Sequence, residues 1–204
     1  MHMPKMVNKE EKIDFICDEA YKMFTDIGIE AFSLNQFIVT LKMSKGQFYH
    51  YFSTKEQLIY QVMSKKAFEL NAHIIEVCKH KKSFIEKLHV LFAIYMNDEA
   101  YYTDFRKLMV DTMHLYINSH DSTIREFNST MYQTVFTILE EIFDEEIQKG
   151  HFHKDAKSIA KSICATADGM FLQSLMVENF DVKTELTHYF LEIEKLSKRL
   201  KKSV

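Results

Sequence analysis

Residues that make turns are scarce in this chain, which has one Pro and four Gly among its 204 residues. Sheet proteins need turn-forming residues about every 8–12 positions, so the sequence cannot supply the turns that a β-rich fold requires. Apolar residues make up 47% of the chain and charged residues 27%, a composition typical of a globular protein with a buried core. The sequence therefore predicts an all-α fold.

Composition also argues against secreted and membrane-spanning proteins. Cys17, Cys78 and Cys164 are isolated, odd in number and lack a Cys-x-x-Cys pair, which indicates buried thiols in a reducing compartment. The N-terminus has no apolar signal segment, and no run approaches about 18 uninterrupted apolar residues. We therefore expect a cytoplasmic protein.

Four helix-start signals stand in the N-terminal half, each a hydroxyl residue followed three positions later by Gln or Glu. They begin at Ser33, Ser44, Thr54 and Ser83, and at this spacing the two side chains can satisfy free amides at a helix N-terminus. Only ten residues lie between Ser33 and Ser44, so the first of these helices can run about two turns before the chain restarts. A short helix, a tight turn and a second short helix are typical of a helix-turn-helix DNA reader.

Apolar residues recur at helical spacing on both sides of this motif. An amphipathic helix is expected at 12–27, followed by Gly28 in the place of a left-handed C-terminal cap. A larger helical body follows, and Gly150 is predicted to cap its longest helix. Its helices are expected at about 54–78, 83–95, 101–117, 122–149, 155–177 and from 184 onward.

Charge is unevenly distributed along the chain, although the net charge is −3. The segment 38–66 holds five Lys and one Glu, whereas 98–148 holds eleven acidic and three basic residues. This asymmetry favours a chain that presents one end to a polyanion, with a solvated charge pattern as the alternative.

The helix that begins at Ser44 carries the candidate DNA contacts. Gln47 can bond bidentately to adenine, Lys45 can reach guanine or a phosphate, and Gly46 allows a close backbone approach. Tyr49, His50, Tyr51 and Lys55 are candidate phosphate donors. The alternative is structural: Gln47 completes the Ser44 cap, and the aromatic residues form the core, as Phe48 and Phe52 do if they point inward together.

Residues 12–58 resemble the N-terminal domain of the TetR family of bacterial transcriptional regulators. The resemblance rests on the run from Ser44 to Leu58, preceded by Ala20, Phe24 and Gly28 at the family's spacing. It implies an all-α homodimer of about nine helices per chain, with a helix-turn-helix domain at 1–54 and an effector-binding and dimerisation domain at 55–204. The DNA face it implies consists of Ser33, Asn35, Ser44, Lys45, Gly46, Gln47, Tyr49, His50, Tyr51 and Lys55.

Two departures from the family pattern lie between the short helices. Phe37-Ile38 stands where the family usually has Ile-Ala, and Lys42-Met43 replaces the usual Gly-Val. If Lys42 adopts the left-handed conformation normally taken by Gly, strain of about 1 kcal/mol is expected.

In the body, the resemblance implies that the last two helices pair with their copies and that the middle helices enclose a small apolar or amphipathic effector. Binding of this effector would release a repressor from double-stranded DNA with a palindromic operator. The candidate effector residues are Tyr95, Phe105, Met109, Met113, Tyr116, Met131, Tyr132, Phe136 and Gln173, with His89 and His114 as further polar candidates. A plain hydrophobic core is the alternative for each apolar position.

An enzyme and a metal-binding protein are the competing classes. His151-x-His153 invites a metal hypothesis, but the sequence holds no zinc-protease motif, phosphate loop or nucleophile elbow. We expect a solvated His pair, no catalytic residues, no metal site and no cofactor. A helical protein-interaction or metal-binding protein without DNA-binding activity stays the alternative.

Overall fold

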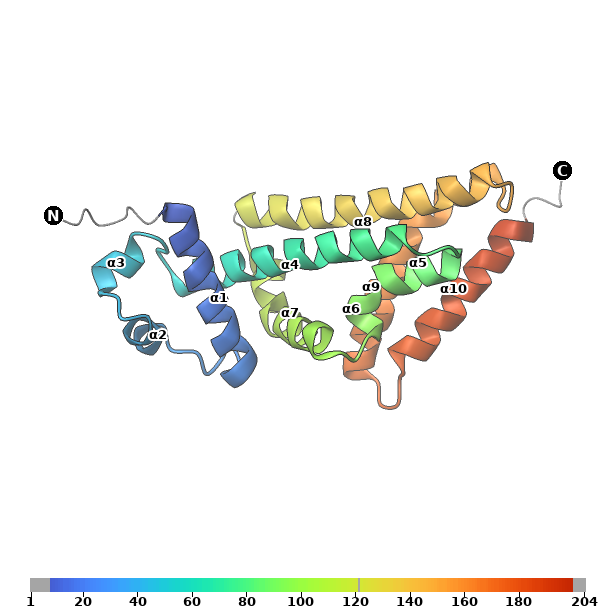
Figure 1. Ribbon diagram of the computed structural model, residues 1–204. Helices are drawn as coiled ribbons and strands as arrows, with labels where there is room; N and C mark the ends of the chain where they lie inside the picture. Colours follow the sequence, from blue (N-terminus) through green and yellow to red (C-terminus); the bar gives the residue numbers. More distant parts are fainter. Residues whose placement is uncertain (1–7, 121, 200–204) are drawn as a thin grey trace. The chain divides into compact units, whose positions relative to one another are not determined.

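A computed structural model describes residues 8–120 and 122–199, and the described chain consists of helices and their connections (Figure 1). It confirms the all-α prediction. Ten α-helices and one 3-10 helix occur among the described residues. They are α1 (Lys9–Ile27), α2 (Leu34–Thr40), α3 (Lys45–Tyr49), α4 (Lys55–Lys79), α5 (Phe84–Leu91), α6 (Ala93–Met96), α7 (Ala100–Asn118), α8 (Ser122–Gln148), η1 (Lys154–Ile159), α9 (Ala160–Met176) and α10 (Val182–Arg199).

Packing divides the chain into two compact units. The first ends at Leu70 and includes Asp104–His120, and the second comprises Asn71–Thr103 and the chain after residue 121. Residues 1–7 and 200–204, at the ends of the two predicted domains, lie outside the described residues. The functional boundary between residues 54 and 55 stays a prediction. None of the described helices combines the length and apolar composition that crossing a bilayer requires.

The core around α1, α2 and α3 is a chain of buried phenylalanine rings. Phe24 contacts Phe32 edge to face at 4.7 Å between ring centroids, and Phe32 contacts Phe37 at 5.2 Å. Phe48 lies between Phe37, at 6.3 Å, and Phe52, at 5.7 Å. All five rings are buried, which confirms that Phe48 and Phe52 point inward. Burial of large aromatic side chains stabilises this small domain and sets the angle between its short helices.

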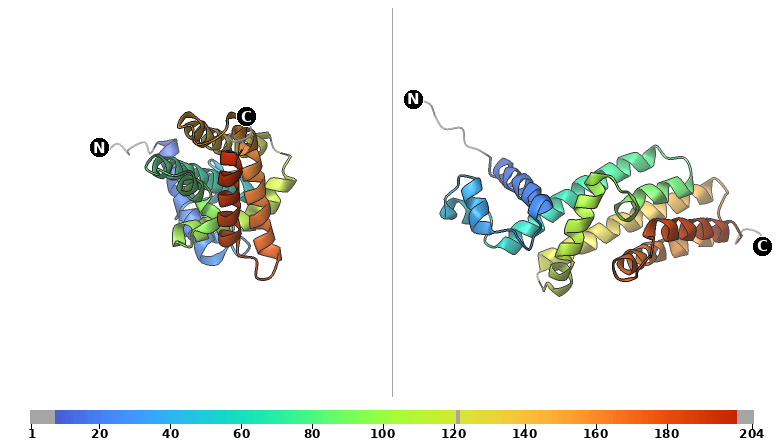
Figure 2. Two further views of the ribbon diagram at one scale, coloured as in Figure 1. Left: turned by 90° about the vertical axis from the view of Figure 1, so that its right-hand side faces the viewer. Right: turned by 90° about the horizontal axis from the view of Figure 1, so that it is seen from below.

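The second unit is built on packing among α5, α8, α9 and α10, and α9 and α10 lie side by side in Figures 1 and 2. Two boundaries differ from the sequence prediction. The helix expected at 83–95 is broken at Phe92, whose φ of −100° and ψ of 19° interrupt the α-helical path. The helix expected from Asp155 begins as the 3-10 helix η1 and becomes α-helical at Ala160. The break at Phe92 raises the number of helices from about nine to ten in the described chain.

Two glycine predictions have different outcomes. Gly150 ends α8 with a φ of 71°, and the N–H of His151 donates to Glu146 O at 2.9 Å, so the predicted left-handed cap is confirmed. Gly28 also has a positive φ, of 79°, but its ψ of 159° lies outside the left-handed helical region. This backbone conformation is essentially restricted to glycine, so Gly28 turns the chain out of α1 by a different geometry from the predicted one.

Candidate nucleic-acid interface

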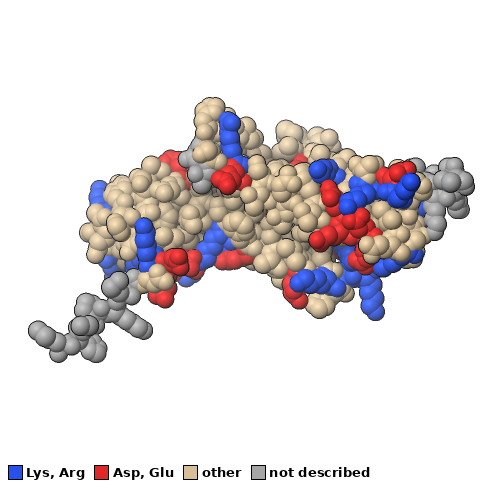
Figure 3. All heavy atoms as spheres, turned by 90° about the horizontal axis from the view of Figure 1, so that it is seen from above, with Lys and Arg blue, Asp and Glu red and all other residues tan. Residues whose placement is uncertain are grey.

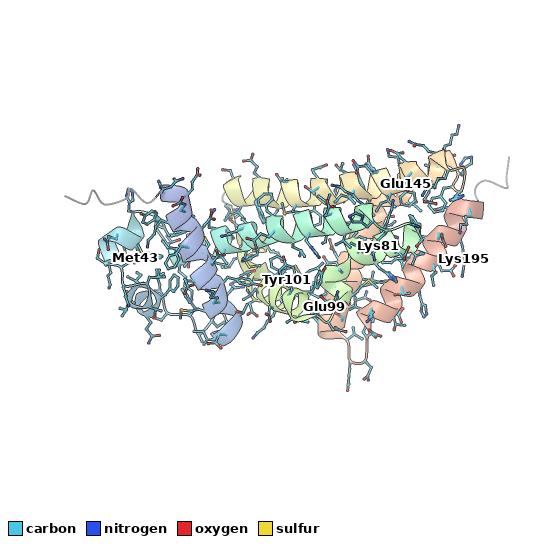
Figure 4. The ribbon with its side chains drawn as sticks, viewed as in Figure 1. Met43, Lys81, Glu99, Tyr101, Glu145 and Lys195 are labelled. Carbon is cyan, nitrogen blue, oxygen red and sulfur yellow. The ribbon has the colours of Figure 1, made fainter. Side chains whose placement is uncertain are left out.

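The turn between α2 and α3 is closed by backbone hydrogen bonds at the end of α2. The N–H of Met43 donates to Ile38 O at 3.2 Å, and the N–H of Lys42 donates to Val39 O at 2.9 Å, the pattern of a Schellman C-terminal cap. Lys42 has a φ of 54°, which confirms the left-handed conformation predicted for it. Figure 4 labels Met43 at this turn. Local hydrogen bonds thus end the short α2, and α3 begins a few residues later.

The start of α3 is a complete capping box. Ser44 Oγ accepts from the N–H of Gln47 at 3.2 Å, and Gln47 Oε1 accepts from the N–H of Ser44 at 2.9 Å. The structural role considered for Gln47 is therefore present. The cap uses only the amide oxygen of Gln47, and the side chain is exposed. Its amide N–H groups remain available as donors to a base edge.

The candidate contact residues of α3 and its C-terminal cap, His50, are all exposed. They are Lys45, Gly46, Gln47, Tyr49 and His50, and the large Tyr49 ring is 47% accessible although it rests against buried Phe48.

The packing of the free protein does not require a glycine at position 46. A Cβ added at this position meets no atom within 4 Å. Glycine in a helix costs about 0.5–1 kcal/mol relative to alanine, so its presence here has no explanation in packing. A close approach of the α3 backbone to another molecule supplies one.

The remaining candidate residues combine structural contacts with exposure. Asn35 is exposed, while Ser33 is half-buried and its Oγ accepts from the N–H of Gln36 at 3.5 Å. Tyr51 is half-buried beside His50, with ring centroids 5.4 Å apart.

Lys55 connects α4 to the segment between α1 and α2. Its Nζ donates to Phe32 O at 2.8 Å and to Ile29 O at 3.0 Å, and it lies 5.4 Å from the centre of the Phe32 ring. The ammonium group has three N–H donors, so one remains for a phosphate. Lys55 therefore braces the domain whether or not it also contacts DNA.

Two of the four predicted capping boxes are incomplete. Ser44 and Ser83 form the full reciprocal pair. For Ser33, the structure shows only the bond from the N3 amide. Thr54 Oγ1 accepts from the N–H of Gln57, but Gln57 Oε1 accepts from Ser53, one residue earlier than predicted. All four sites still begin helices, because a single side-chain acceptor is enough to cap the first turn.

The local positive charge is smaller in the folded chain than in the sequence window. Lys65 Nζ lies 3.2 Å from Asp14 and 3.1 Å from Asp18, and Lys66 Nζ lies 3.3 Å from Asp18. Burial raises the pKa of the Asp18 carboxyl, but the hydrogen bonds and charges of the two Lys outweigh it and leave the pKa below its usual value. These lysines join α4 to α1. Of the window's five lysines, only Lys42 and Lys45 have an ammonium group without an ion pair or a hydrogen bond among the described residues.

The acidic segment of the body is likewise partly neutralised. Lys87, which is 8% exposed, pairs with Glu145, while Lys149 pairs with Glu145 and Glu146 and Lys157 pairs with Asp144. Figure 3 shows Lys and Arg side chains interleaved with Asp and Glu side chains over the C-terminal part of α8, where Figure 4 labels Glu145. The charge difference predicted between segments 38–66 and 98–148 is therefore smaller in the folded chain, because ion pairs neutralise charges in both segments.

The candidate effector residues are divided between the two units. Phe105, Met109, Met113 and Tyr116 belong to the first unit. The Tyr116 ring packs edge to face on Tyr60 at 5.1 Å, and burial raises the pKa of Tyr116. Tyr95, Met131, Tyr132, Phe136 and Gln173 belong to the second unit.

In the second unit, two of these residues converge on Asp168, which the sequence analysis did not select. The Tyr95 hydroxyl donates to Asp168 Oδ1 at 2.6 Å, and the Tyr132 hydroxyl donates to Oδ2 at 3.0 Å. Gln173 is exposed on the same helix, α9, and Met131 Sδ accepts from Asn71 Nδ2 at 3.3 Å. The available signal for Asp168 was an acidic residue within the apolar run of 163–177.

The histidines are occupied by local contacts or exposed. His151 Nδ1 lies 2.8 Å from Glu146, and His153, whose side chain is only 19% exposed, caps η1 by accepting from the N–H of Asp155. The prediction of a solvated pair is therefore wrong for His153. His89 Nε2 contacts Thr187 Oγ1 at 3.3 Å, and His114 is exposed. Within the described ranges, no group of three or more His, Cys, Asp or Glu side chains is arranged to hold a metal ion.

The three cysteines are buried, as predicted. Burial raises the pKa of the Cys17 and Cys164 thiols to about 12 and also raises that of Cys78, so all three are protonated and weakly nucleophilic near neutral pH.

The last two helices expose apolar side chains. Leu172, Leu175 and Met176 are accessible on α9, as are Leu191 and Leu196 on α10, and Met176 is 75% exposed. A Cβ added at Gly169, one turn before the α9 group, meets no atom within 4 Å. Several large exposed apolar side chains on two neighbouring helices are typical of protein interaction surfaces.

Comparison with known proteins adds two findings. Residues 16–62 match the family model described as bacterial regulatory proteins, tetR family. No curated protein resembles the chain closely enough in sequence to be matched.

Solved structures share the fold over nearly the whole chain. A TetR-family transcriptional regulator from Cytophaga hutchinsonii superposes with a TM-score of 0.69 at 19% identity, covering 95% of this chain and 96% of that one. A TetR transcription regulator from Haloarcula marismortui has a TM-score of 0.73 at 13% identity, with 92% and 98% covered. A transcriptional regulator from Saccharomonospora viridis, solved in complex with choline, has a TM-score of 0.72 at 14% identity, with 91% and 96% covered.

Proposed function

We propose that this chain, which belongs to the TetR family of bacterial regulatory proteins, is a cytoplasmic, non-catalytic repressor that acts as a homodimer on a palindromic double-stranded operator. The observation that carries DNA binding is the exposed first turn of α3. It presents Lys45, a glycine that the fold does not need, and the free amide donors of Gln47.

The proposed contacts fall into two groups. Gln47 and Lys45 read base edges, because they lie at the start of the recognition helix. Ser33 and Asn35 lie at backbone- and base-contacting positions of α2. Ser44, Tyr49, His50, Tyr51 and Lys55 position the domain on the phosphate backbone, and Gly46 allows α3 to approach closely.

Residue roles can be separated by two substitutions at Gln47 and one at Lys55. Gln47→Glu keeps an acceptor that completes the Ser44 cap but loses the amide donors, whereas Gln47→Ala loses both. We expect both Gln47 variants to relax base preference at one operator position, while Lys55→Ala weakens binding to all sequences alike. The measurement is selection of bound duplexes from random DNA, followed by titration at several salt concentrations. Equal effects on selectivity from Gln47→Glu and Lys55→Ala would contradict these roles.

The exposed apolar residues of α9 and α10 support dimerisation through the last two helices. A two-fold dimer would place two recognition helices about 34–36 Å apart, one turn of DNA, which explains why a palindromic operator is proposed. Met176→Glu should shift the protein to monomers in sedimentation velocity. Ile117→Glu is the matched control, because Ile117 on α7 is 73% exposed against 75% for Met176. A dimer that survives Met176→Glu would exclude this interface.

A small apolar or amphipathic effector is proposed to release the operator from the protein. The choline complex of the Saccharomonospora viridis regulator supports the capacity of this fold to hold a small molecule. The candidate residues are Tyr95, Phe105, Met109, Met113, Tyr116, Met131, Tyr132, Phe136 and Gln173. A ligand screen for loss of anisotropy of a labelled protein–operator complex tests this step, and a rise in DNA affinity on ligand binding would indicate an activator instead.

A further inference from the structure

Asp168 of α9 is a carboxylate held by two neutral donors. Both of its oxygens accept hydrogen bonds, one from Tyr95 of α6 and one from Tyr132 of α8, which is the pattern of an ionised carboxylate. Among the residues that the structure describes, no Lys, Arg or His forms an ion pair with Asp168. Charges taken out of water are usually paired with an opposite charge, whereas the half-buried Asp168 is partnered by neutral hydroxyls alone among the described residues.

The two tyrosines orient the carboxylate without neutralising it. Burial, followed by the charge of Asp168, raises the pKa of both Tyr95 and Tyr132. Both hydroxyls therefore keep their protons near neutral pH and act as donors. The three side chains come from three helices of the second unit, so their geometry depends on the packing of that unit and not on one flexible segment.

An aromatic surface adjoins the carboxylate. The Tyr95 ring stacks with the Phe171 ring at 4.7 Å and with the Phe92 ring at 6.4 Å between centroids. Tyr132, by contrast, is 47% exposed, and its ring lies 6.1 Å from that of Phe136. Lys161 Nζ already lies 5.5 Å from the centre of the Phe136 ring, so the rings of α8 that face α9 can interact with a cation.

We propose that Asp168 and Tyr132 bind a small organic cation with alkyl substituents. The cation supplies the counter-charge for the Asp168 carboxylate. The carboxylate attracts the charge, and the exposed ring of Tyr132 takes the alkyl groups by cation–π and apolar contact. An anion would be repelled by Asp168, and a hard divalent metal would need about six oxygen ligands, which this site does not offer. The inference rests on the proposed function, because it names the chemical class of the effector.

The test is calorimetric titration of the full chain with tetraethylammonium chloride, against potassium chloride at equal ionic strength. We expect one saturable site per chain for tetraethylammonium and none for potassium. Asp168→Asn should weaken binding about tenfold because it removes the counter-charge. Tyr132→Leu should weaken it by a similar factor, whereas Tyr132→Phe, which keeps the ring, should bind nearly as the wild type does.

Glu178→Gln is the matched control for charge. It removes one negative charge from an exposed residue of the same unit that forms no hydrogen bond with Asp168 or with either tyrosine, and it should leave binding unchanged. Circular dichroism and thermal unfolding of each variant verify that the fold is retained. The inference is overturned if the wild type shows no saturable site, if Asp168→Asn binds as tightly as the wild type, or if Glu178→Gln loses as much affinity.

DNA binding is measured separately, on the selected duplex without the cation. Asp168-dependent cation binding by a chain that fails to bind any duplex would refute the proposed function and support the cation site. Tight operator binding by a chain with no cation site would refute only the present inference.

Discussion

Gly46→Ala is expected to stabilise the protein and weaken its binding to DNA at once. Gly46 lies inside α3, where an added Cβ meets no atom within 4 Å, so the substitution creates no clash in the free protein. Alanine is favoured over glycine in helices by about 0.5–1 kcal/mol. Because α3 has only five residues and Gly46 stands near its start, we expect a gain of about 0.5 kcal/mol, or roughly 1–2 °C in Tm for a chain of this size.

The effect on DNA has the opposite sign. If the backbone at Gly46 approaches the DNA closely, a methyl group there forces the recognition helix outward and should cost about 1.4 kcal/mol, a tenfold loss of affinity. Unfolding in urea gives the stability change, and fluorescence anisotropy on the selected duplex at constant salt gives the affinity. Gly46→Leu extends the series, since a larger side chain should lower affinity further while the free protein stays folded.

Either measurement can refute the reasoning. A Gly46→Ala protein that is less stable than the wild type would mean that the space around this glycine is needed by the fold. A more stable variant that binds DNA as tightly as the wild type would remove the reason for a close approach of α3.

Three further predictions concern stability. Lys42→Gly removes left-handed strain of about 1 kcal/mol at φ 54°, but it also raises the conformational entropy of the unfolded chain. Urea unfolding should therefore show a net gain in stability of about 0.5 kcal/mol at most, whereas the β-branched Lys42→Val should be less stable than the wild type. Equal stability of the two variants would rule out strain at this position. Ser197→Ala removes a buried hydroxyl that has no hydrogen-bond partner in the described chain. The substitution should raise the free energy of unfolding by about 1 kcal/mol, which would appear as a rise in Tm of about 2–4 °C. A fall in Tm would show that the hydroxyl has a partner. Because the folded-state pKa of Asp18 is lowered, its contribution is present above the unfolded pKa of about 4 and is lost as pH falls through the folded value. Asp18→Asn should therefore be less stable at pH 7, by under about 1 kcal/mol for this half-exposed group, and the gap in Tm should close as the pH is lowered; a constant gap would exclude the ion pairs with Lys65 and Lys66.

Local chemistry made much of the DNA-reading domain predictable. The Ser44 cap uses atoms three residues apart, and the turn at Lys42 is closed by backbone hydrogen bonds to Ile38 and Val39. These features depend on neighbouring backbone groups, whose partners lie within one helical turn. The same holds for Gly150, which ends α8 where the apolar period stops.

Contacts between distant segments were not predictable in the same way. The sequence window around the recognition helix counted Lys65 and Lys66 as part of a positive surface, but both pair with acidic residues of α1. Lys55 was expected to contact a phosphate, but in the folded chain its ammonium group donates hydrogen bonds to two backbone carbonyls of the segment before α2. A long, flexible side chain can reach several partners, and only tertiary packing decides which of them is near.

By itself, the sequence determined that this protein is helical, where most of its helices begin, and that α2 and α3 are short and separated by a tight turn. These properties follow from side-chain capping, helical periodicity and glycine geometry, all of which act over a few residues. Only the tertiary structure decided that Tyr95 and Tyr132 meet Asp168, from positions 73 and 36 residues away along the chain. Helical periodicity tells which face of each helix is buried, but not which face of another helix it meets, so the partners of this carboxylate emerge only when α6, α8 and α9 are packed together.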